Sequence, residues 1–486
     1  MSLQYRMKHY RIERKGYASL CGRGMCLCLI LCCLCNTMIR AVNANEQGDR
    51  NNPPTQKAEV DEPNIYQESF FVLAEALRTR HPGLLNTPLS AMSLDDFESW
   101  TEETYEMLSG VDNRRDFFFV VSSYLSRFKD GHSGIFYGPM EKKILPVSLT
   151  WIGEHLFISK AFDARFSHVI GKEIIKIGDY DTADFEVKIN AYRQTDEKNL
   201  FHLRKEQFGS NFFLMLYDTY AYFDLLKDNS IVFTLKDAEG VENLSFPFIG
   251  MEGIAEEDFF VLARNPITRC TYKNGFTVVE DLSTLYFQMG MDELSSQMIE
   301  DIFRTIKKKG LKNLVLDLRN SGGGEAAEEA VEFFKYLVPK TGYYFGFTGW
   351  TREGVENVEV ANNDGRIWIE QTVEDLRFDG RLIVFTNGTT FSSSAIFAMM
   401  VQDNDFGSIW GEPCGSNVFR FGKRTIVPLP QIDMAASFSS NIWDSANSEN
   451  GNRFIQPDVM VYQTIDHYLT GEDALWDYYR GRINGQ

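Results

Sequence analysis

The spacing of apolar residues divides the chain into a helical part, a strand-rich part and an alternating part. Apolar residues recur at helical spacing in 67–80, and Ser93 and Asp116 stand where two further helices are expected to begin. Residues 145–248 change to short apolar runs typical of strands. From Gly275 onward, strand-like runs alternate with helical patterns, which predicts an α/β core. These changes predict an N-terminal helical domain (65–140), a β-rich insert (141–252) and a core (253–486).

Two loops of the alternating part follow buried strands and carry candidate chemistry. Residues 382–398, LIVFTNGTTFSSSAIFA, run from a strand through an Asn-Gly turn into a helix whose start holds three serines. Such a turn exposes a hydroxyl and aims backbone N–H groups at whatever binds there, although the serines alone would also suit simple capping. Residues 314–325, LVLDLRNSGGGE, place three glycines before a helical pattern, so the backbone can approach a ligand closely. Neither Gly-Lys-Ser/Thr nor GxGxxG is present, which argues against a phosphate loop.

Six short motifs, taken in order, resemble the tail-specific or C-terminal-processing serine proteases and the related tricorn-core peptidases. They are Asp317-Leu318-Arg319-Asn320, Gly322-Gly323-Gly324, Thr390-Phe391-Ser392-Ser393-Ser394, Gln402-Asp403, Gly411-Glu412-Pro413 and Gln456-Pro457-Asp458. Each motif is weak alone, but their order and spacing over roughly 140 residues are specific. The resemblance implies a serine endopeptidase that acts on protein or peptide substrates. Its nucleophile would be Ser392, and the N–H groups of Gly322, Gly323 and Ser393 are candidates for its oxyanion hole.

The same resemblance implies an architecture. The α/β part would be a ClpP/crotonase-like spiral core of ββα units, preceded by the N-terminal helical domain and a PDZ-like β-rich insert. Residues 171–178 resemble the strand-turn segment of the PDZ domains in family members. PDZ modules bind peptide C-termini by adding a strand to a sheet edge. An unrelated β-rich insert is the alternative.

The family activates its serine with either a lysine or a histidine. Counting from 411–413 places Asn417 at the lysine position of the tail-specific branch, whereas Lys423 lies six residues later. In the tricorn-like branch a histidine lies in an Asp-Gly-His turn, here 130–132, and a glutamate lies in a Glu-Asn-x-Gly segment. Residues 449–451 match that segment with one residue missing. The resemblance therefore implies His132 as general base and Glu449 as the orienting carboxylate, and histidine has the pKa that suits this task near neutral pH.

Three alternatives remain open from sequence. A Ser-Lys dyad would use Lys423, and a catalytically silent peptide-binding protein could keep the fold while losing activity. An acyl-CoA enzyme on a crotonase-like fold is disfavoured, because export would separate it from CoA. His132 could instead be a polar turn residue, and Glu449 a solvated loop carboxylate. No metal or organic cofactor is expected, because no HExxH or Cys/His ligand spacing joins the histidines.

The composition and the N-terminus indicate an exported protein. The net charge of −19 argues against a nucleic-acid partner. A basic stretch precedes an apolar run, 25–38, that is too short to span a membrane comfortably. We therefore expect a signal peptide at 1–44, a disordered tether at 45–64, a periplasmic or extracellular location and no membrane span in the mature chain. Lipid anchoring and oligomerisation stay open, and Cys270 and Cys414, which remain after the leader, are expected to be unpaired.

Overall fold

The computed structural model describes residues 62–84, 92–136, 141–205, 213–254, 275–291, 294–319, 321–324, 327–353, 357–360, 365–418, 420–447 and 454–485. The predicted signal peptide and all but the end of the predicted tether lie outside these residues. None of the described helices is both long enough and apolar enough to cross a membrane.

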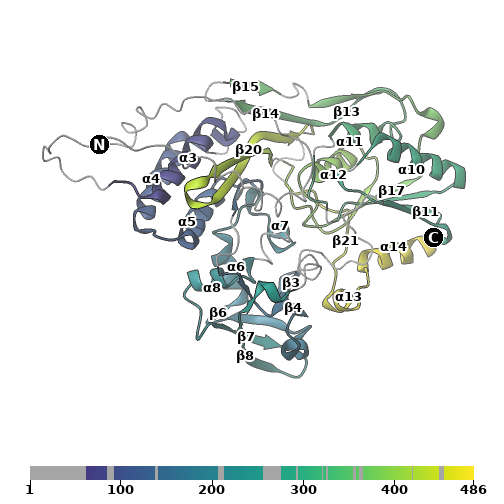
Figure 1. Cartoon of the computed structure of the whole chain (residues 1–486). Coiled ribbons are helices and arrows are strands. Elements are labelled where there is room, and N and C mark those ends of the chain that lie inside the picture. Colours follow the sequence, from purple (N-terminus) through teal and green to yellow (C-terminus); the bar gives the residue numbers. More distant parts are fainter. Residues whose placement is uncertain are drawn as a thin grey trace.

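Three helices form the N-terminal part, coloured purple in Figure 1: α3 (Ile65–Arg80), α4 (Leu94–Met107) and α5 (Arg114–Ser126). The side chain of Ser93 caps α4 as predicted, by accepting from the N–H of Asp96. The third helix begins earlier than predicted, because Asn113 is its N-cap and accepts from the N–H of Asp116. His81 ends α3 as its C-cap residue.

A short strand attaches this helical part to the rest of the molecule. Strand β1 (Gly134–Phe136) follows α5 and pairs antiparallel with the long strand β20 (Met434–Ser445), with Gly134 opposite Ser437. Strands β14 (Phe347–Glu353) and β19 (Arg420–Leu429) also pair with β20, and β15 (Asn357–Val360) pairs with β14. The turn between α5 and β1 is therefore held against a strand about 300 residues later in the chain.

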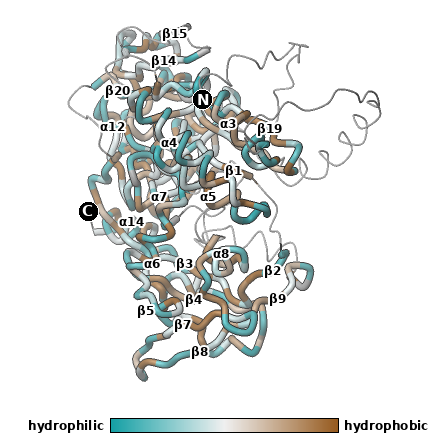
Figure 2. The backbone as a smooth tube through the Cα atoms, turned by 90° about the vertical axis from the view of Figure 1, so that its left-hand side faces the viewer, coloured by the Kyte–Doolittle hydropathy of each residue, from teal (hydrophilic) through white to brown (hydrophobic). Residues whose placement is uncertain are grey.

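The insert is a second sheet with short helices. Its strand order is β3-β4-β5-β7-β8, with β6 paired to β5. The strands are β3 (Val147–Ile152), β4 (His155–Ala161), β5 (Glu173–Ile177), β6 (Tyr180–Asp181), β7 (Ser230–Lys236) and β8 (Val241–Pro247), and the helices are α6 (Thr182–Asn190), α7 (Leu200–Lys205) and α8 (Tyr217–Tyr222). Beside it, β2 (Lys143–Ile144) pairs with β9 (Ile249–Gly250). Figures 1 and 2 show these strands as a lobe beneath the N-terminal helices. The two parts nevertheless share one continuous hydrophobic cluster.

The remaining elements form the predicted mixed α/β core. Its sheet has the order β10-β11-β12-β17-β18-β21, in which β10 and β11 are antiparallel and the other neighbours are parallel. The strands are β10 (Gly275–Val279), β11 (Thr284–Gln288), β12 (Asn313–Asp317), β17 (Arg381–Thr386), β18 (Ser408–Gly411) and β21 (Val459–Met460). The helices between them are α10 (Ser296–Lys309), α11 (Ala327–Phe334) and α12 (Ser393–Asp403).

Both faces of the core sheet are covered, as is usual for parallel strands. Leu314 and Leu316 of β12 belong to the cluster that includes residues of α10, α11 and α12. Val315 points to the opposite face, where α14 (Ala474–Asn484) packs, because successive side chains of a strand alternate.

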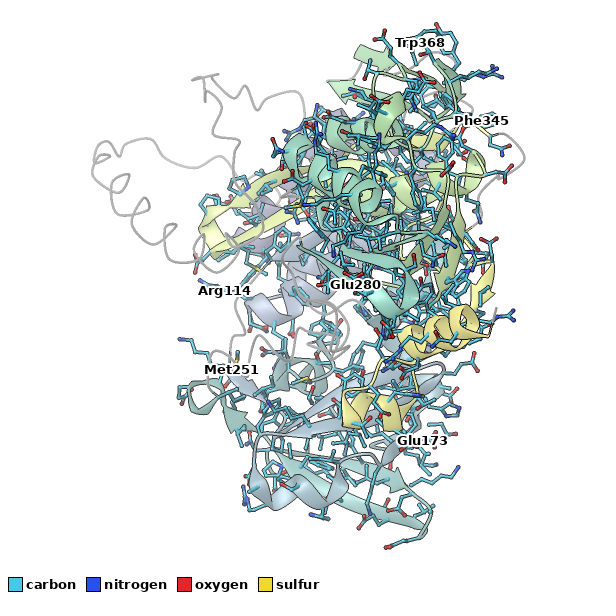
Figure 3. The ribbon with its side chains drawn as sticks, turned by 90° about the vertical axis from the view of Figure 1, so that its right-hand side faces the viewer. Arg114, Glu173, Met251, Glu280, Phe345 and Trp368 are labelled. Carbon is cyan, nitrogen blue, oxygen red and sulfur yellow. The ribbon has the colours of Figure 1, made fainter. Side chains whose placement is uncertain are left out.

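Two further elements, the paired strands β13 (Gly342–Phe345) and β16 (Arg366–Ile369), lie far from the insert: in Figure 3, Phe345 and Trp368 are at the opposite end of the molecule from Glu173. Helix α13 (Ile465–Thr470) contacts β4 of the insert.

Candidate active site

Ser392 lies on a strained turn between β17 and α12. It is the N-cap of α12 with φ 52° and ψ −126°, a combination that residues other than glycine rarely adopt. Its N–H donates to the hydroxyl of Ser416 at 2.9 Å, which helps to hold this backbone conformation. A sharp turn from a strand into a helix is also how hydrolases expose a nucleophilic hydroxyl.

The glycine loop after β12 is fastened to this serine turn. The N–H of Phe391 donates to the carbonyl of Ser321 at 3.1 Å. The hydroxyl of Ser393 accepts from the N–H of Gly324 and donates to its carbonyl, both at 2.7 Å. Gly323, at φ 95°, approaches so closely that a Cβ there would lie 2.5 Å from Cβ of Ser392. Only glycine fits this position, whereas a Cβ on Gly322 would meet open space.

Two backbone N–H groups beside Ser392 are available to a ligand. Within the described part of the chain, the N–H groups of Gly323 and Ser393 have no hydrogen-bond acceptor, while that of Gly324 is taken by Ser393. Ser393 is the first residue of α12, where the helix dipole favours negative charge. The arrangement can therefore receive a small anionic oxygen next to the serine hydroxyl.

His132 lies in the turn between α5 and β1, and its ring reaches the serine turn. Its Nε2 lies 3.1 Å from Oγ of Ser392, 260 residues away in sequence. Its backbone N–H donates to Asp130 at 2.9 Å, and its carbonyl accepts from the hydroxyl of Ser437 on β20. Both the N–H and the hydroxyl of Ser439 donate to Asp130 as well. The pairing of β1 with β20 thus sets the position of the histidine.

The surroundings of His132 keep its imidazole neutral near pH 7. Burial lowers the pKa of His132 to about 4, and Arg424, Arg420 and His202 act in the same direction, whereas Asp130 opposes them. Its Nδ1 is 3.9 Å from Oδ1 of Asp130 and has no hydrogen-bond partner among the described residues. A neutral ring can accept the proton of Ser392 through Nε2.

A second histidine supports the turn from behind. His81 is fully buried, its Nδ1 accepts from the N–H of Gly83 at 3.1 Å, and its Nε2 lies 3.4 Å from Oδ2 of Asp130. Because Nδ1 accepts a hydrogen bond, a neutral His81 ring carries its proton on Nε2, the nitrogen nearer to the carboxylate. Burial would raise the pKa of Asp130, but His81 and His132 outweigh it and hold that pKa well below its usual range. Asp130 is therefore a buried, ionised group under the histidine turn.

Three residues near Ser392 and His132 lie in no motif, and the sequence did not predict them as part of the site. Asp196 accepts from the N–H of Gly131 at 2.9 Å, and Ser416 accepts from the N–H of Ser392. The ring of His202 stacks on Phe391 with centroids 4.4 Å apart. All three reach the site through tertiary contacts, so no local spacing could have indicated them.

One group of side chains has the spacing of a possible cation site. A ligand atom on each of Asp130, His132 and Asp196 lies within 4.8 Å of the other two. The carboxylate of Asp130 already accepts from the N–H of His132 and from the hydroxyls of Ser133 and Ser439. Its remaining capacity to bind a cation is small, so this cluster suits hydrogen bonding better than metal binding.

The other predicted positions differ in how they relate to the site. Lys423 lies on β19 with an exposed side chain, and Asn417, at the alternative lysine position, is buried. Glu449 lies outside the described residues, so its placement stays a prediction. Cys414 is a buried free thiol, and Cys270 also lies outside the described residues.

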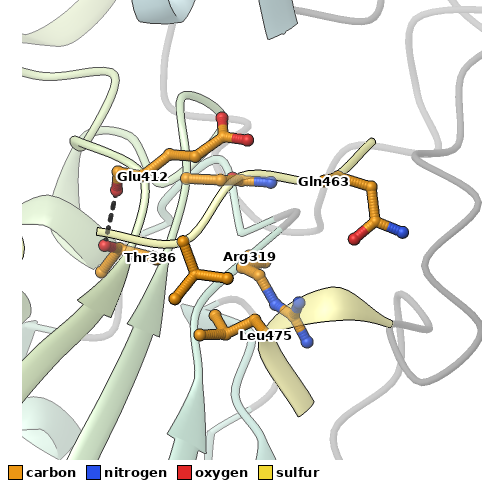
Figure 4. A pocket seen from close by; sticks show the side chains of 8 residues that line it. Arg319, Thr386, Glu412, Gln463 and Leu475 are labelled. Atoms are coloured by element: carbon orange, nitrogen blue, oxygen red, sulfur yellow. Dashed lines mark hydrogen bonds between the residues drawn. The ribbon is translucent and has the colours of Figure 1, made fainter. Parts of the chain in front are cut away.

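A small pocket lies at the carboxyl ends of the core strands, and neither Ser392 nor His132 lines it. Figure 4 shows it between Arg319, Thr386, Glu412, Gln463 and Leu475. Arg319 is not free to bind a ligand there, because its guanidinium is paired with the carboxylates of Asp317 and Asp473. This part of the Asp-Leu-Arg motif therefore anchors α14 to β12.

A serine on a strained strand-to-helix turn, next to a neutral histidine on a mixed α/β fold, defines the class of the serine hydrolases. Residues 286–461 match the model of peptidase family S41, which assigns this part of the chain to that family. Ser392 and the glycine loop lie inside the matched range. His132 lies outside it, so the structure is what connects the histidine turn to the family core.

Two solved structures of CPAF share the fold over most of the chain. Mature CPAF in complex with lactacystin has a TM-score of 0.58 at 9% identity, over 87% of this chain and 99% of that one. Mature CPAF alone gives a TM-score of 0.56 at 9% identity, over 86% and 96%. A putative peptidase from Parabacteroides merdae ATCC 43184 gives 0.46 at 12% identity, over 86% and 96%. The likeness to CPAF covers far more than 286–461, so the shared fold extends beyond the family match.

Proposed function

We propose that this chain is an exported serine endopeptidase that hydrolyses peptide bonds of proteins or peptides through an acyl-enzyme intermediate. The observation that carries the proposal is the 3.1 Å distance between Nε2 of His132 and Oγ of Ser392. A serine hydroxyl needs a base within hydrogen-bond reach, and this distance meets the requirement.

Each step of the reaction has a residue to perform it. His132 takes the proton of Ser392 as the hydroxyl attacks the substrate carbonyl, and a tetrahedral intermediate forms. The N–H groups of Gly323 and Ser393 stabilise its oxyanion, with Gly322 as the remaining candidate donor. His132 then gives the proton to the leaving amine, and water hydrolyses the ester with His132 again acting as base. Glu449 is the proposed orienting carboxylate of His132, on the strength of its motif.

The lysine alternative is less well supported by the geometry. A lysine base must be neutral, and its ordinary pKa of about 10.4 falls enough only through burial or a nearby cation. Lys423 is exposed, whereas the hydroxyl of Ser392 is within reach of His132. A catalytically silent peptide-binding protein would have no need for this pairing.

The finer architecture is part of the same proposal. The succession of β11, α10, β12, α11, β17, α12 and β18 is consistent with a ClpP/crotonase-like spiral core. The insert, with its sheet and α6, is proposed to be PDZ-like and to bind peptide ends. A signal peptide at 1–44 would direct the chain to the periplasm or the cell exterior.

The test is turnover of an unfolded protein by the purified chain and by Ser392→Ala. The substitution removes only a hydroxyl, so thermal unfolding should be nearly unchanged while cleavage is abolished. Wild-type chain that leaves the substrate intact would favour the silent binding protein. Cleavage by Ser392→Ala near the wild-type rate would reject Ser392 as nucleophile.

A further inference from the structure

A segment of the insert, residues 194–202, also holds the histidine turn. The N–H of Gly131 donates to Oδ1 of Asp196 at 2.9 Å, and Lys129 pairs with Glu197 at 2.9 Å. The side-chain amide of Gln194 donates to the carbonyl of Ser122 in α5 at 2.8 Å. We call residues 194–202 the bridging segment, because its second half contacts the serine side.

The second half of the bridging segment contacts the loop around Ser392. The side-chain amide of Asn199 donates to the carbonyls of Cys414 and Gly415 at 2.9 and 2.8 Å. The ring of His202 stacks on Phe391, one residue before Ser392, and its Nδ1 is 3.1 Å from the carbonyl of Gly388. The bridging segment therefore contacts both the turn that carries His132 and the loops around Ser392. Its position affects the distance between these two side chains.

Asp196 is a charged residue of this segment that lies close to His132. Its side chain is buried, with 1% of the residue exposed, and a carboxylate oxygen lies within 4.8 Å of a ring nitrogen of His132. Oδ2 of Asp196 has no hydrogen-bond partner at ordinary distances among the described residues. The approach requires Gly131, because a Cβ there would lie 2.9 Å from Oδ1 of Asp196 and 2.8 Å from the ring of Phe391.

We propose that Asp196 is a positioning residue for the His132 base. It fixes the histidine turn through Gly131 and, when ionised, supplies a buried negative charge that favours the imidazolium formed as His132 takes the proton of Ser392. This inference rests on the proposed function. It means that Asp196, a residue of the insert, contributes to the reaction at Ser392 in the core.

The charges that face these two groups predict a distinctive pH dependence. Burial raises the pKa of Asp196 to about 7, with Asp130 adding to the rise and with Gly131, Arg420 and Ser416 opposing it. Burial lowers the pKa of His132 to about 4, aided by Arg424, Arg420 and His202. If His132 alone controlled activity, the rate would fall only near pH 4. If ionised Asp196 is also needed, the rate falls near pH 7.

The test uses Asp196→Asn in the full chain and the rate at which a fluorophosphonate labels Ser392 between pH 4 and 9. Asparagine keeps the size of the side chain and an oxygen for the N–H of Gly131, while it removes the charge. We expect labelling at pH 8 to fall about 10- to 100-fold, at or below the usual contribution of a general base. The acid limb should also move from near pH 7 towards pH 4. Asp184→Asn, which removes an exposed carboxylate from α6, is the matched control and should change neither quantity.

The possible outcomes separate this inference from the function beneath it. A wild-type acid limb near pH 4 overturns the inference without any variant, so it stays testable even if Asp196→Asn fails to fold. If folded Asp196→Asn has an unchanged labelling rate and an unchanged acid limb of the pH profile, the inference is overturned as well. In that case, loss of labelling in Ser392→Ala and His132→Ala would still support the proposed protease function. If the wild-type chain neither cleaves the substrate nor reacts with the fluorophosphonate, the proposed function is rejected, and this inference is rejected with it.

Discussion

The three consecutive serines at the start of α12 have three different environments. The hydroxyl of Ser392 is within reach of His132, and that of Ser393 binds both backbone groups of Gly324. The hydroxyl of Ser394 is buried and lies 2.6 Å from that of Ser321. Only the first serine is placed for nucleophilic attack, while the other two hold the glycine loop against the turn.

The role of the Ser393 hydroxyl leads to a prediction at the residue scale. Ser393→Ala keeps the backbone N–H but frees both groups of Gly324, so the glycine loop loses its anchor. Each of these two hydrogen bonds contributes about 1 kcal/mol, and we expect turnover to fall roughly tenfold with a small drop in melting temperature. Ser393→Thr, which retains a hydroxyl, should recover most of the rate. Full activity of Ser393→Ala would show that the hydroxyl does not position the loop.

Individual site residues differ in how far the sequence could reveal them. Ser392 and His132 each lie in a motif, and the structure brings these two side chains together. Asp196 and His202 lie in no motif and reach the site only because the bridging segment folds against both loops. Glu449 stays a prediction from its motif alone.

At the scale of elements, the site lies where two neighbouring parallel strands, β12 and β17, end. Strands β12 and β17 are paired in parallel, so the glycine loop that follows one and the serine turn that follows the other emerge at the same edge. The alternating apolar pattern predicted both strands and the helix after each loop. It could not predict the pairing of β1 with β20, which depends on contacts between residues about 300 positions apart.

The close approach of these two loops makes Gly323 intolerant of a side chain. In Gly323→Val, the new Cβ would collide with Ser392 and occupy a backbone conformation, φ 95°, that valine rarely adopts. The loop must move, and its N–H moves away from the oxyanion position, so turnover should fall about 10²- to 10³-fold. The same substitution at Gly110, where a Cβ meets no atom within 4 Å, should leave the rate unchanged. A folded Gly323→Val with normal turnover would place the oxyanion hole elsewhere.

At the scale of the whole molecule, the site draws on all three parts of the chain. The proposed base, His132, comes from the turn after the N-terminal helices, the proposed nucleophile, Ser392, from the core, and Asp196 from the insert. The division of the chain into three domains stays a prediction, and local sequence patterns carry no information on how the three parts meet. The shared hydrophobic cluster of the N-terminal helices and the insert shows that they pack as neighbours.

The central claim is that His132 activates Ser392. Its most direct test is to label the wild type, His132→Ala and Lys423→Ala with a fluorophosphonate at pH 8 and to locate the modified residue by mass spectrometry. We expect the label on Ser392, a loss of about 10²- to 10⁴-fold in His132→Ala, and nearly wild-type labelling in Lys423→Ala. Labelling that survives in His132→Ala and disappears in Lys423→Ala would contradict the account and make the protein a Ser-Lys peptidase.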